Sequence, residues 1–329
     1  MKVLSLTKRL LCEAGLTDVL WSLRPNGLYC FNFHRIGDSQ STDFDPCVFS
    51  CNKDDLRQYL TFINANFEVI DIPALHTLIE SGKAPDKRYA LITFDDGYRD
   101  NFDNAFPVLQ ELGLSAAFFI TTSLIGSAQL PWWDEIAWYV KHLKGRTLDL
   151  PGFDVPITIP EKITPDVIKS VLSRVKRHST DFDALLTALK ETSGGQVPSL
   201  SSKQNLFMTW EHLRALLDGG MSIGAHSHSH RILSFLSMKE LEFELSHSKH
   251  ILDSELNTEI NTLSYPVGSA HTYNEMVLLT AKRLGYRSAF SFGSKINVNI
   301  ADNHMELGRF SIDRPFDEAW FKKLCLTSG

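Results

Sequence analysis

Short apolar runs alternate with longer amphipathic segments along most of the chain. The apolar runs are rich in Val, Ile, Leu and Phe and end at Gly or polar residues, which is typical of buried strands. We expect strands at 27–34, 67–71, 89–95, 115–121, 221–226, 261–266, 287–292 and 306–312, and helices at 54–67, 73–81, 101–112, 210–217, 238–252 and 274–284. Such alternation favours a parallel sheet covered by helices. Seven or eight units predict an α/β barrel, with functional side chains at the C-terminal ends of the strands.

The segment from 127 to 205 interrupts this alternation. It is too long for a plain loop, and residues 164–192 within it have a helical pattern. A Ser- and Gly-rich stretch at 193–202 leads back to the strands. We therefore expect one barrel domain over 27–329 that carries a mostly helical insertion on its rim.

The first 26 residues precede the barrel and have an amphipathic helical pattern over 5–23. Lys2, Lys8 and Arg9 resemble the start of a signal peptide, but acidic residues from Glu13 onward interrupt the apolar run. No stretch of the sequence reaches the ~18 apolar residues needed to span a bilayer. A helix packed on the barrel is the preferred interpretation, and peripheral association with a membrane surface is the alternative.

Composition narrows the class of protein. With 329 residues, of which 43% are hydrophobic and 22% charged, the chain can bury a large core. A net charge of −6 and the lack of a basic stripe with interleaved aromatics argue against a nucleic-acid partner. The five Cys lack zinc-knuckle spacing and are expected to be reduced thiols. We expect a cytoplasmic protein, with the inner face of the membrane as the alternative; the oligomeric state is left open.

Two adjacent carboxylates, Asp95 and Asp96, follow the apolar run that begins at Leu91 and lie directly before Gly97. Neighbouring strand residues face opposite sides, so the pair belongs at the end of the strand, where Gly97 lets the chain turn. Two like charges so close destabilise each other. A bound metal ion would resolve this conflict, whereas the alternative is a solvated acidic turn.

A group of three histidines, His226, His228 and His230, follows a second apolar run about 130 residues later. If a helical turn began here, His226 and His230 would lie on one face, a known arrangement for binding a divalent metal. The alternative is a surface cluster. Together with the aspartate pair, the histidines favour a metal site, because one Asp and two His leave a position open for a hydrolytic water.

With these motifs the chain resembles the polysaccharide deacetylases, the NodB-homology domain or carbohydrate esterase family four. Thr93 to Gly97 match the first motif of that family, Thr-Phe-Asp-Asp-Gly, and His226 to His230 match the second. Ser264 to Gly268 match a third motif in part, and the resemblance covers roughly 27–127 and 206–315. It implies a distorted (β/α) barrel of seven to eight strands.

The resemblance also implies a chemistry and a substrate. Asp96, His226 and His230 would hold a divalent metal, with Zn first and Co, Ni or Fe as alternatives. Asp95, surplus to coordination, would act as general base toward the attacking water. The implied activity is N-deacetylation of N-acetylhexosamine units in a surface or exported polysaccharide or its precursor. Within the insertion, Trp132 could stack on sugar rings, although a role in the core is the preferred interpretation for it and its neighbouring tryptophans.

The third motif departs from the family pattern. An Arg that normally orients the base carboxylate is replaced by Ser264, and Arg309 or Arg314 could substitute for it in space. Substrate contacts are expected from Arg309 and from the loop that follows Ser264. In that loop, Tyr265 could line an acetyl pocket, Pro266 stands at a strand end, and the Val267 backbone N–H could bind the oxyanion.

The late Leu-x-His motif, the family's source of the general acid, is absent. His34 ends the first predicted strand, and in a barrel the first strand lies beside the last. This arrangement resembles the permuted deacetylases that act on poly-N-acetylglucosamine, so His34 is the candidate acid. The alternative is a hydrogen-bonded histidine without catalytic duty, in which case His271 or His304 would be next.

Two other functions remain open from the sequence. One is a metal-dependent hydrolase of a non-sugar amide on the same fold. The other is a carbohydrate-binding protein that has lost catalysis, for which the missing motif Arg is the only support. The intact set of Asp95, Asp96, His226 and His230 argues against this second alternative, because a binding module has no use for a base beside a metal.

Overall fold

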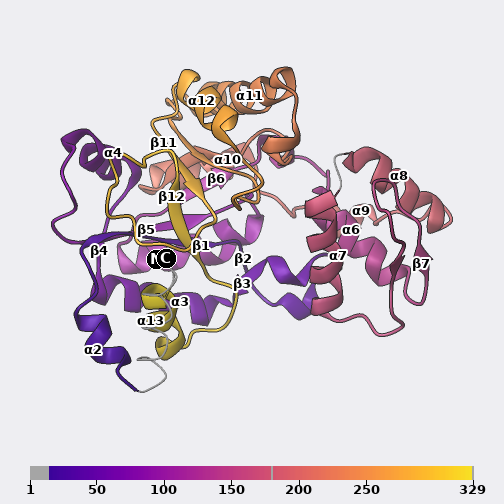
Figure 1. The fold of residues 1–329 in the computed structure, drawn as a ribbon, viewed down its shortest axis with the longest axis horizontal. Coiled ribbons are helices and arrows are strands. Elements are labelled where there is room, and N and C mark those ends of the chain that lie inside the picture. Colours follow the sequence, from indigo (N-terminus) through magenta and orange to yellow (C-terminus); the bar gives the residue numbers. More distant parts are fainter. Residues whose placement is uncertain (1–14, 179–180, 328–329) are drawn as a thin grey trace.

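The computed structural model describes residues 15–178 and 181–327 (Figure 1). Seven parallel strands close into a barrel: β1 (Gly27–Phe33), β5 (Arg88–Phe94), β6 (Ala117–Ile120), β9 (Ser222–Ala225), β10 (Thr262–Ser264), β11 (Ser288–Ser291) and β12 (Leu307–Ser311). The barrel closes because β1 pairs with β12 on one side and with β5 on the other. An eighth strand, β4 (Glu68–Val69), pairs only with β5. The predicted α/β barrel is confirmed.

The barrel strands are buried along almost their whole length, which explains their continuous apolar sequences. Helices cover the outside: α3 (Lys53–Asn66), α4 (Ile72–Ser81), α5 (Phe106–Leu112), α10 (Trp210–Asp218), α11 (Met238–Leu256), α12 (Glu275–Arg283) and α13 (Glu318–Thr327). All but α13 were predicted. The first turns predicted for α5 form a separate π-helical turn, Asn101–Ala105. Short 3-10 turns occupy Ser39–Ser41, Pro46–Val48, Thr122–Leu124 and Leu233–Phe235.

Local sequence signals set several helix boundaries. The Asn52 side chain accepts hydrogen bonds from the first backbone N–H groups of α3, and Ser237 forms a capping box with Glu240 at the start of α11. Gly82 ends α4 in the left-handed conformation. The boundaries of α3 and α4 and the start of α11 therefore lie within one residue of the positions expected from the sequence, whereas α11 continues past the expected end at 252 to Leu256.

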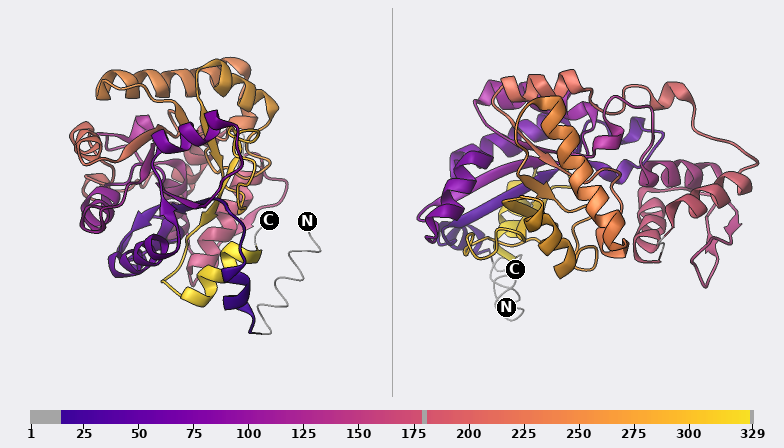
Figure 2. Two further views of the ribbon diagram at one scale, coloured as in Figure 1. Left: turned by 90° about the vertical axis from the view of Figure 1, so that its left-hand side faces the viewer. Right: turned by 90° about the horizontal axis from the view of Figure 1, so that it is seen from above.

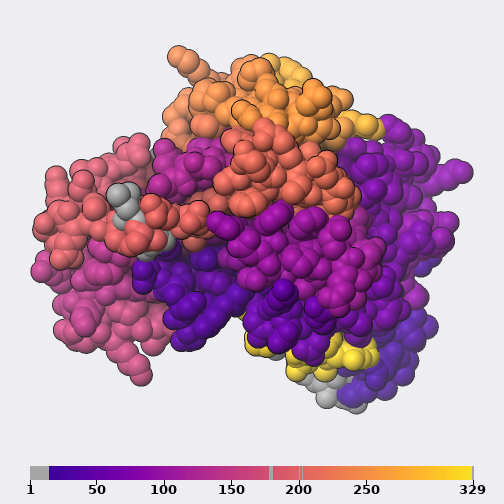
Figure 3. All heavy atoms as spheres, turned by 180° about the vertical axis from the view of Figure 1, so that it is seen from behind, coloured from indigo at the N-terminus to yellow at the C-terminus, as the bar shows by residue number. Residues whose placement is uncertain are grey.

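The insertion consists of α6 (Trp132–His142), α7 (Pro165–His178), α8 (Phe182–Thr192) and α9 (Leu200–Lys203), with a two-stranded hairpin of β7 (Thr147–Leu148) and β8 (Ile157–Thr158). It stands at one end of the barrel (Figures 1 and 2) and has its own apolar core, to which Trp132, Trp133 and Trp138 belong. The 3-10 turn at Pro46–Val48 contacts α7. From behind, the early chain in indigo lies between the insertion and the barrel (Figure 3).

A short parallel pair, β2 (Arg35–Ile36) with β3 (Phe49–Cys51), leads from the end of β1 toward the insertion. At the other end of the molecule, α2 (Thr17–Ser22) lies beside α13 (Figure 1). Trp21 of α2 packs on Phe62 and Phe67 and donates a hydrogen bond of 3.0 Å to the Asn66 side chain.

The described part of the N-terminal segment thus packs on α3, whereas residues 1–14, where most of the predicted amphipathic helix falls, lie outside the described residues. Among the helices that the structure describes, none is long and apolar enough to cross a membrane. Four of the cysteines, Cys30, Cys47, Cys51 and Cys325, are free thiols, and Cys12 lies outside the described residues.

Candidate metal centre and catalytic pocket

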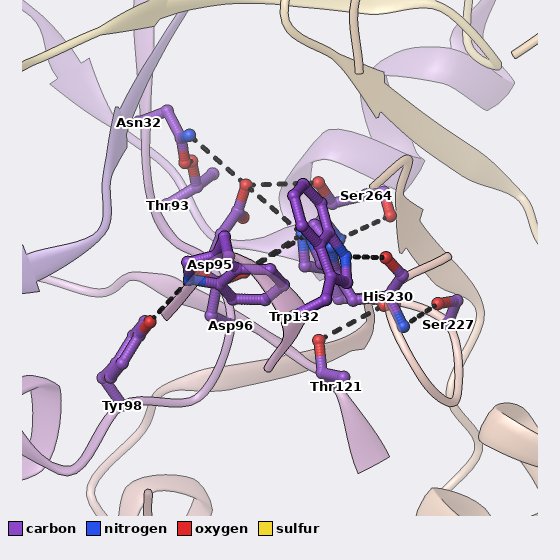
Figure 4. A network of polar contacts seen from close by, with 12 residues as sticks. Asn32, Thr93, Asp95, Asp96, Tyr98, Thr121, Trp132, Ser227, His230 and Ser264 are labelled. Atoms are coloured by element: carbon purple, nitrogen blue, oxygen red, sulfur yellow. Dashed lines mark hydrogen bonds and ion pairs between the residues drawn. The ribbon is translucent and has the colours of Figure 1, made fainter. Parts of the chain in front are cut away.

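Side chains from several strand ends meet at the C-terminal end of the barrel (Figure 4). Asp95 and Asp96 follow β5 directly, and His226 follows β9. His34 follows β1, and Arg309 reaches the same place from within β12. Because the strands are parallel, residues far apart in the sequence arrive at one rim, as expected for a barrel.

Asp96, His226 and His230 form a compact group of ligand atoms. Asp96 Oδ1 lies 3.5 Å from Nε2 of His226 and 3.5 Å from Nε2 of His230, and the three ligand atoms lie within 4.8 Å of one another. Asp96 Oδ1 is buried and has no hydrogen-bond partner. A buried acceptor without a donor, facing two imidazole nitrogens, fits a cation held by all three side chains.

The histidines do not lie on a helical turn, so that expectation was wrong. Residues 226–230 form an irregular loop in which Ser227 and His230 have positive φ angles of 61° and 55°. The His230 N–H donates to Ser227 Oγ at 3.0 Å, and the Glu244 carboxylate of α11 accepts the N–H groups of residues 228 and 229. Local hydrogen bonds therefore replace helical spacing in bringing His226 and His230 together, with ring centroids 4.8 Å apart.

Asp96 also has a strained backbone, with φ at 77°, which is uncommon for a residue with a side chain. Gly97 follows with φ at 88°, so the chain turns sharply as soon as β5 ends. This turn lets Asp95 and Asp96 point to different neighbours, which a regular strand followed by a regular turn would not achieve. Backbone strain of this kind is typical of functional sites.

The surroundings of His226 suit a bound cation. Its Nδ1 lies 2.7 Å from the Ser264 carbonyl oxygen, so Nδ1 carries a proton and Nε2 is the nitrogen that faces Asp96. Burial alone would lower the pKa of His226, but the Asp95 and Asp96 carboxylates raise it overall, so the site attracts positive charge. Burial, followed by the charge of His226, lowers the pKa of His230 to about 3, which keeps its imidazole neutral. Burial alone would raise the pKa of Asp96, but the neighbouring His226 and His230 imidazoles lower it overall.

Asp95 is held by Arg309. Arg309 donates two parallel hydrogen bonds, from Nη1 to Asp95 Oδ1 at 2.8 Å and from Nη2 to Asp95 Oδ2 at 2.7 Å. Arg309 is only 1% exposed and also donates to Ser264 Oγ, the residue at the position of the family's Arg. Burial alone would raise the pKa of Asp95, but the Arg309 guanidinium, together with His226 and His34, lowers it overall. Arg314, the other candidate, instead lies 3.6 Å from Asp313 in an exposed pair.

His34 lies at the rim of the same pocket. Its backbone N–H donates to Ser50 Oγ, and its carbonyl accepts from the Asn101 side chain. Among the described residues no hydrogen bond involves its ring nitrogens. Burial lowers the pKa of His34, while the Asp96 and Asp95 carboxylates oppose this change. Of the other candidate acids, neither His271, which is exposed, nor His304, which bonds the Ala301 carbonyl, lines the pocket.

A cavity of 380 Å³ opens above these residues. Of the residues expected to contact substrate, Tyr265, Val267 and Arg309 line the cavity, whereas Pro266 does not. The Tyr265 hydroxyl donates a hydrogen bond of 2.9 Å to the Met305 carbonyl. The Val267 N–H donates to no other group in the part of the chain that the structure describes, so it remains available to an oxyanion.

Two tryptophans of α6, Trp132 and Trp133, belong both to the core of the insertion and to the cavity wall. The ring of Trp133 lies 4.3 Å from that of His230, and Trp132 Nε1 donates to the His230 carbonyl at 3.2 Å. Trp133 Nε1 also donates to the Tyr98 hydroxyl, which in turn donates to the buried Asp134 at 2.7 Å. These hydrogen bonds connect the insertion to His230, one of the three candidate metal ligands. No local signal in the sequence predicts them, because the residues meet only in the folded protein.

Comparison with known proteins agrees with this geometry. The family model described as "Polysaccharide deacetylase" matches residues 82–289. A curated relative, the "Putative polysaccharide deacetylase YxkH" of Bacillus subtilis (strain 168), is 21% identical over 236 residues, which is 71% of this chain and 56% of the relative. The chain thus spans little more than half the length of that protein.

Solved structures share the fold. The Streptococcus pyogenes deacetylase PplD, determined in complex with acetate, matches with a TM-score of 0.58 at 17% identity, over 92% of this chain and 99% of that one. IcaB from Ammonifex degensii matches with a TM-score of 0.58 at 13% identity, over 93% of this chain and 99% of that one.

Proposed function

The chain belongs to the polysaccharide deacetylase family, and we propose that it is a metal-dependent N-deacetylase acting on N-acetylhexosamine units of a surface or exported polysaccharide or its precursor. The observation that carries this proposal is the arrangement of the two aspartates. Asp96 offers a buried, unpartnered oxygen to a cation between His226 and His230, while Arg309 holds the neighbouring Asp95 out of that group.

Amide hydrolysis has two difficulties, because the carbonyl is a poor electrophile and water is a poor nucleophile. A divalent ion held by Asp96, His226 and His230, with Zn²⁺ first, would polarise the acetyl carbonyl and lower the pKa of water. The remaining work falls to residues of the protein. Arg309 keeps Asp95 ionised and oriented, so the carboxylate can accept the proton of the attacking water.

Two further groups complete the reaction. Val267 lines the cavity, and its free N–H would stabilise the negative charge that develops on the acetyl oxygen. The leaving amine is too basic to depart unprotonated, and His34, which lines the cavity, would donate a proton to it. Trp132 and Trp133 form an apolar part of the cavity wall on the side of the insertion.

Arg309 also weakens the case for a binding protein that has lost catalysis. That alternative depended on the missing motif Arg, and Arg309 makes a bidentate contact of the kind that residue is expected to make. Hydrolysis of a non-sugar amide remains the second candidate. The cytoplasmic location, with the inner face of the membrane as the alternative, and peripheral membrane association stay predictions.

The decisive experiment measures acetate release from N-acetylated oligosaccharides before chelation, after chelation and after Zn²⁺ is restored. We expect activity that is lost with the metal and regained with it. Linear and cyclic ureides and small non-sugar amides serve as competing substrates. If these are hydrolysed and no amino-sugar oligomer releases acetate with the metal site filled, the sugar substrate is wrong while the hydrolase chemistry stands.

A further inference from the structure

One wall of the catalytic cavity comes from the insertion. Four residues of α7 line the cavity, namely Lys169, Leu172, Ser173 and Lys176. Spacings of three, four and seven residues place them on one face of the helix. Two turns of α7 thus bring two lysines to the cavity that also contains the candidate metal ligands Asp96, His226 and His230. Neither lysine has a role in the proposed mechanism.

Neither lysine has a partner within the described part of the chain, where no hydrogen bond or ion pair involves Lys169 or Lys176. Lys169 is exposed, but Lys176 is partly buried. Its Nζ lies 5.9 Å from the ring centroid of Trp132, the residue that bonds the His230 carbonyl. Burial lowers the pKa of Lys176, and the charges of Asp45 and Asp96 oppose this change. An ammonium group removed from water without a partner is costly, which favours an anionic ligand beside it.

The charges around the cavity leave a positive excess once a divalent ion is bound. Asp95 is neutralised by Arg309, and Asp313 lies beside Arg314. The charges of the remaining two carboxylates of the cavity wall, Asp45 and Asp96, balance those of the two lysines. The Asp45 side chain already accepts the Cys47 N–H at 2.8 Å. A cation at Asp96 would add two positive charges to a balanced set, so the loaded cavity would attract anions.

We propose that Lys169 and Lys176 bind an anionic group, a carboxylate or a phosphate, that the substrate carries next to its N-acetylhexosamine unit. This inference rests on the proposed function and narrows its substrate class. The lysines form charge-assisted hydrogen bonds to this group. They also repel the ammonium group that deacetylation creates, which disfavours polymers already rich in free amino sugars and assists release of the product.

The test compares three substrates with the zinc-loaded enzyme. They are a neutral N-acetylglucosamine tetramer, a tetramer of alternating glucuronic acid and N-acetylglucosamine, and N-acetylglucosamine 1-phosphate. We expect kcat/KM to be about tenfold higher or more for at least one charged substrate than for the neutral one, and this preference to shrink with added salt. The two charged substrates distinguish a carboxylate from a phosphate.

The variants are Lys169→Gln, Lys176→Gln and the double variant, with Arg177→Gln as the matched control. Arg177 lies on the same helix and carries the same charge but does not line the cavity. Loss of Lys176 should reduce the ratio of charged to neutral kcat/KM about tenfold, and the double variant should reduce it further. The control should keep the wild-type ratio. Equal kcat/KM for neutral and charged substrates in the wild type, or an unchanged ratio in the double variant, overturns the inference.

Binding provides a readout that does not depend on turnover. Calorimetric titration of the glucuronate tetramer into Asp95→Asn should give a Kd that rises about tenfold when Lys176→Gln is added to it. Equal affinity in the two proteins contradicts the inference. If no substrate releases acetate but this difference in Kd appears, the lysine site stands and the proposed function fails. If neutral and charged oligomers release acetate equally, the function stands and the lysine site fails.

Discussion

Arg309 and Asp95, 214 residues apart in the sequence, form a bidentate ion pair in the interior of the barrel. Barrel closure makes this contact possible. Asp95 follows β5 and Arg309 lies in β12, and β1 is the single strand between β5 and β12. Asn32 of β1 lies between them, accepting from Arg309 at 2.9 Å and donating to Asp95 at 3.3 Å. The base carboxylate is therefore oriented from the last strand of the barrel.

Arg309→Met should remove both catalysis and stability. Without the guanidinium, Asp95 is a buried charge without its partner, and breaking a buried pair costs about 3–5 kcal/mol. We expect a lower free energy of unfolding in urea and loss of acetate release. Arg314→Met, which removes an exposed arginine from the same region, is the control and should change little. Equal losses in the two variants would contradict this assignment.

Asp96→Ala and His230→Ala should lose the metal, because each removes one of three ligands. Elemental analysis of the purified proteins measures the ratio of metal to protein, which we expect to approach one in the wild type. His228→Ala is the matched control, since His228 bonds Thr122 and does not line the cavity. Stoichiometric metal in both ligand variants would exclude this site.

Asp95→Asn should keep the metal and lose most of its turnover. The Asp95 carboxylate pairs with Arg309 and is not one of the three candidate metal ligands. The amide of the Asn side chain in the variant cannot accept a proton from water. General-base catalysis contributes roughly 10²–10⁴-fold, so kcat should fall by that factor while metal content stays at the wild-type level. Activity close to that of the wild type would mean that another group is the base.

His34→Ala should reduce kcat on amides while metal content and fold are preserved. Activated aryl acetates have leaving groups that depart without a proton, so their hydrolysis should be affected much less. The ratio of the two activities is the measurement. Equal losses on amide and ester would make His34 a structural or binding residue, and His271→Ala and His304→Ala would then be compared in the same assay.

Asp134 should make stability depend on pH. Burial raises its pKa to about 7, whereas a carboxyl group in an unfolded chain titrates near 3.9. The folded state therefore binds this proton more tightly, so its contribution to stability is present at low pH and is lost as the pH rises from about 4 to about 7. The loss of stability over this range should amount to a few kcal/mol, because a tenfold difference in proton affinity between the two states is worth about 1.4 kcal/mol.

The check on Asp134 compares urea unfolding of the wild type and Asp134→Asn at about pH 4.5 and about pH 7.5. Because other titrating groups are common to both proteins, their contributions cancel in the difference. The wild type should lose stability relative to the variant as the pH rises. Parallel curves would show that Asp134 titrates alike in the folded and unfolded chains.

The elements of this fold were largely predictable, because hydrophobic period and capping residues act over a few neighbours. All eight expected strands and six expected helices form, and the mostly apolar sequence of 89–94 indicated a buried strand. The helix α13 was missed, and the helical turn proposed for 226–230 was wrong. There, the hydrogen bonds of Glu244 and Ser227 outweigh local helical preference.

The sequence by itself determined which chemistry was available at the strand ends, since short-range patterns put Asp95, Asp96 and His226 directly after buried strands. Only the tertiary structure decided which distant residues serve them. Arg309 rather than Arg314 reaches Asp95, Pro266 stays out of the cavity, and α7 brings Lys176 to its wall. The reason is physical: local spacing determines the faces of strands and helices, whereas contacts across the barrel depend on its closure and on how the insertion packs against its rim.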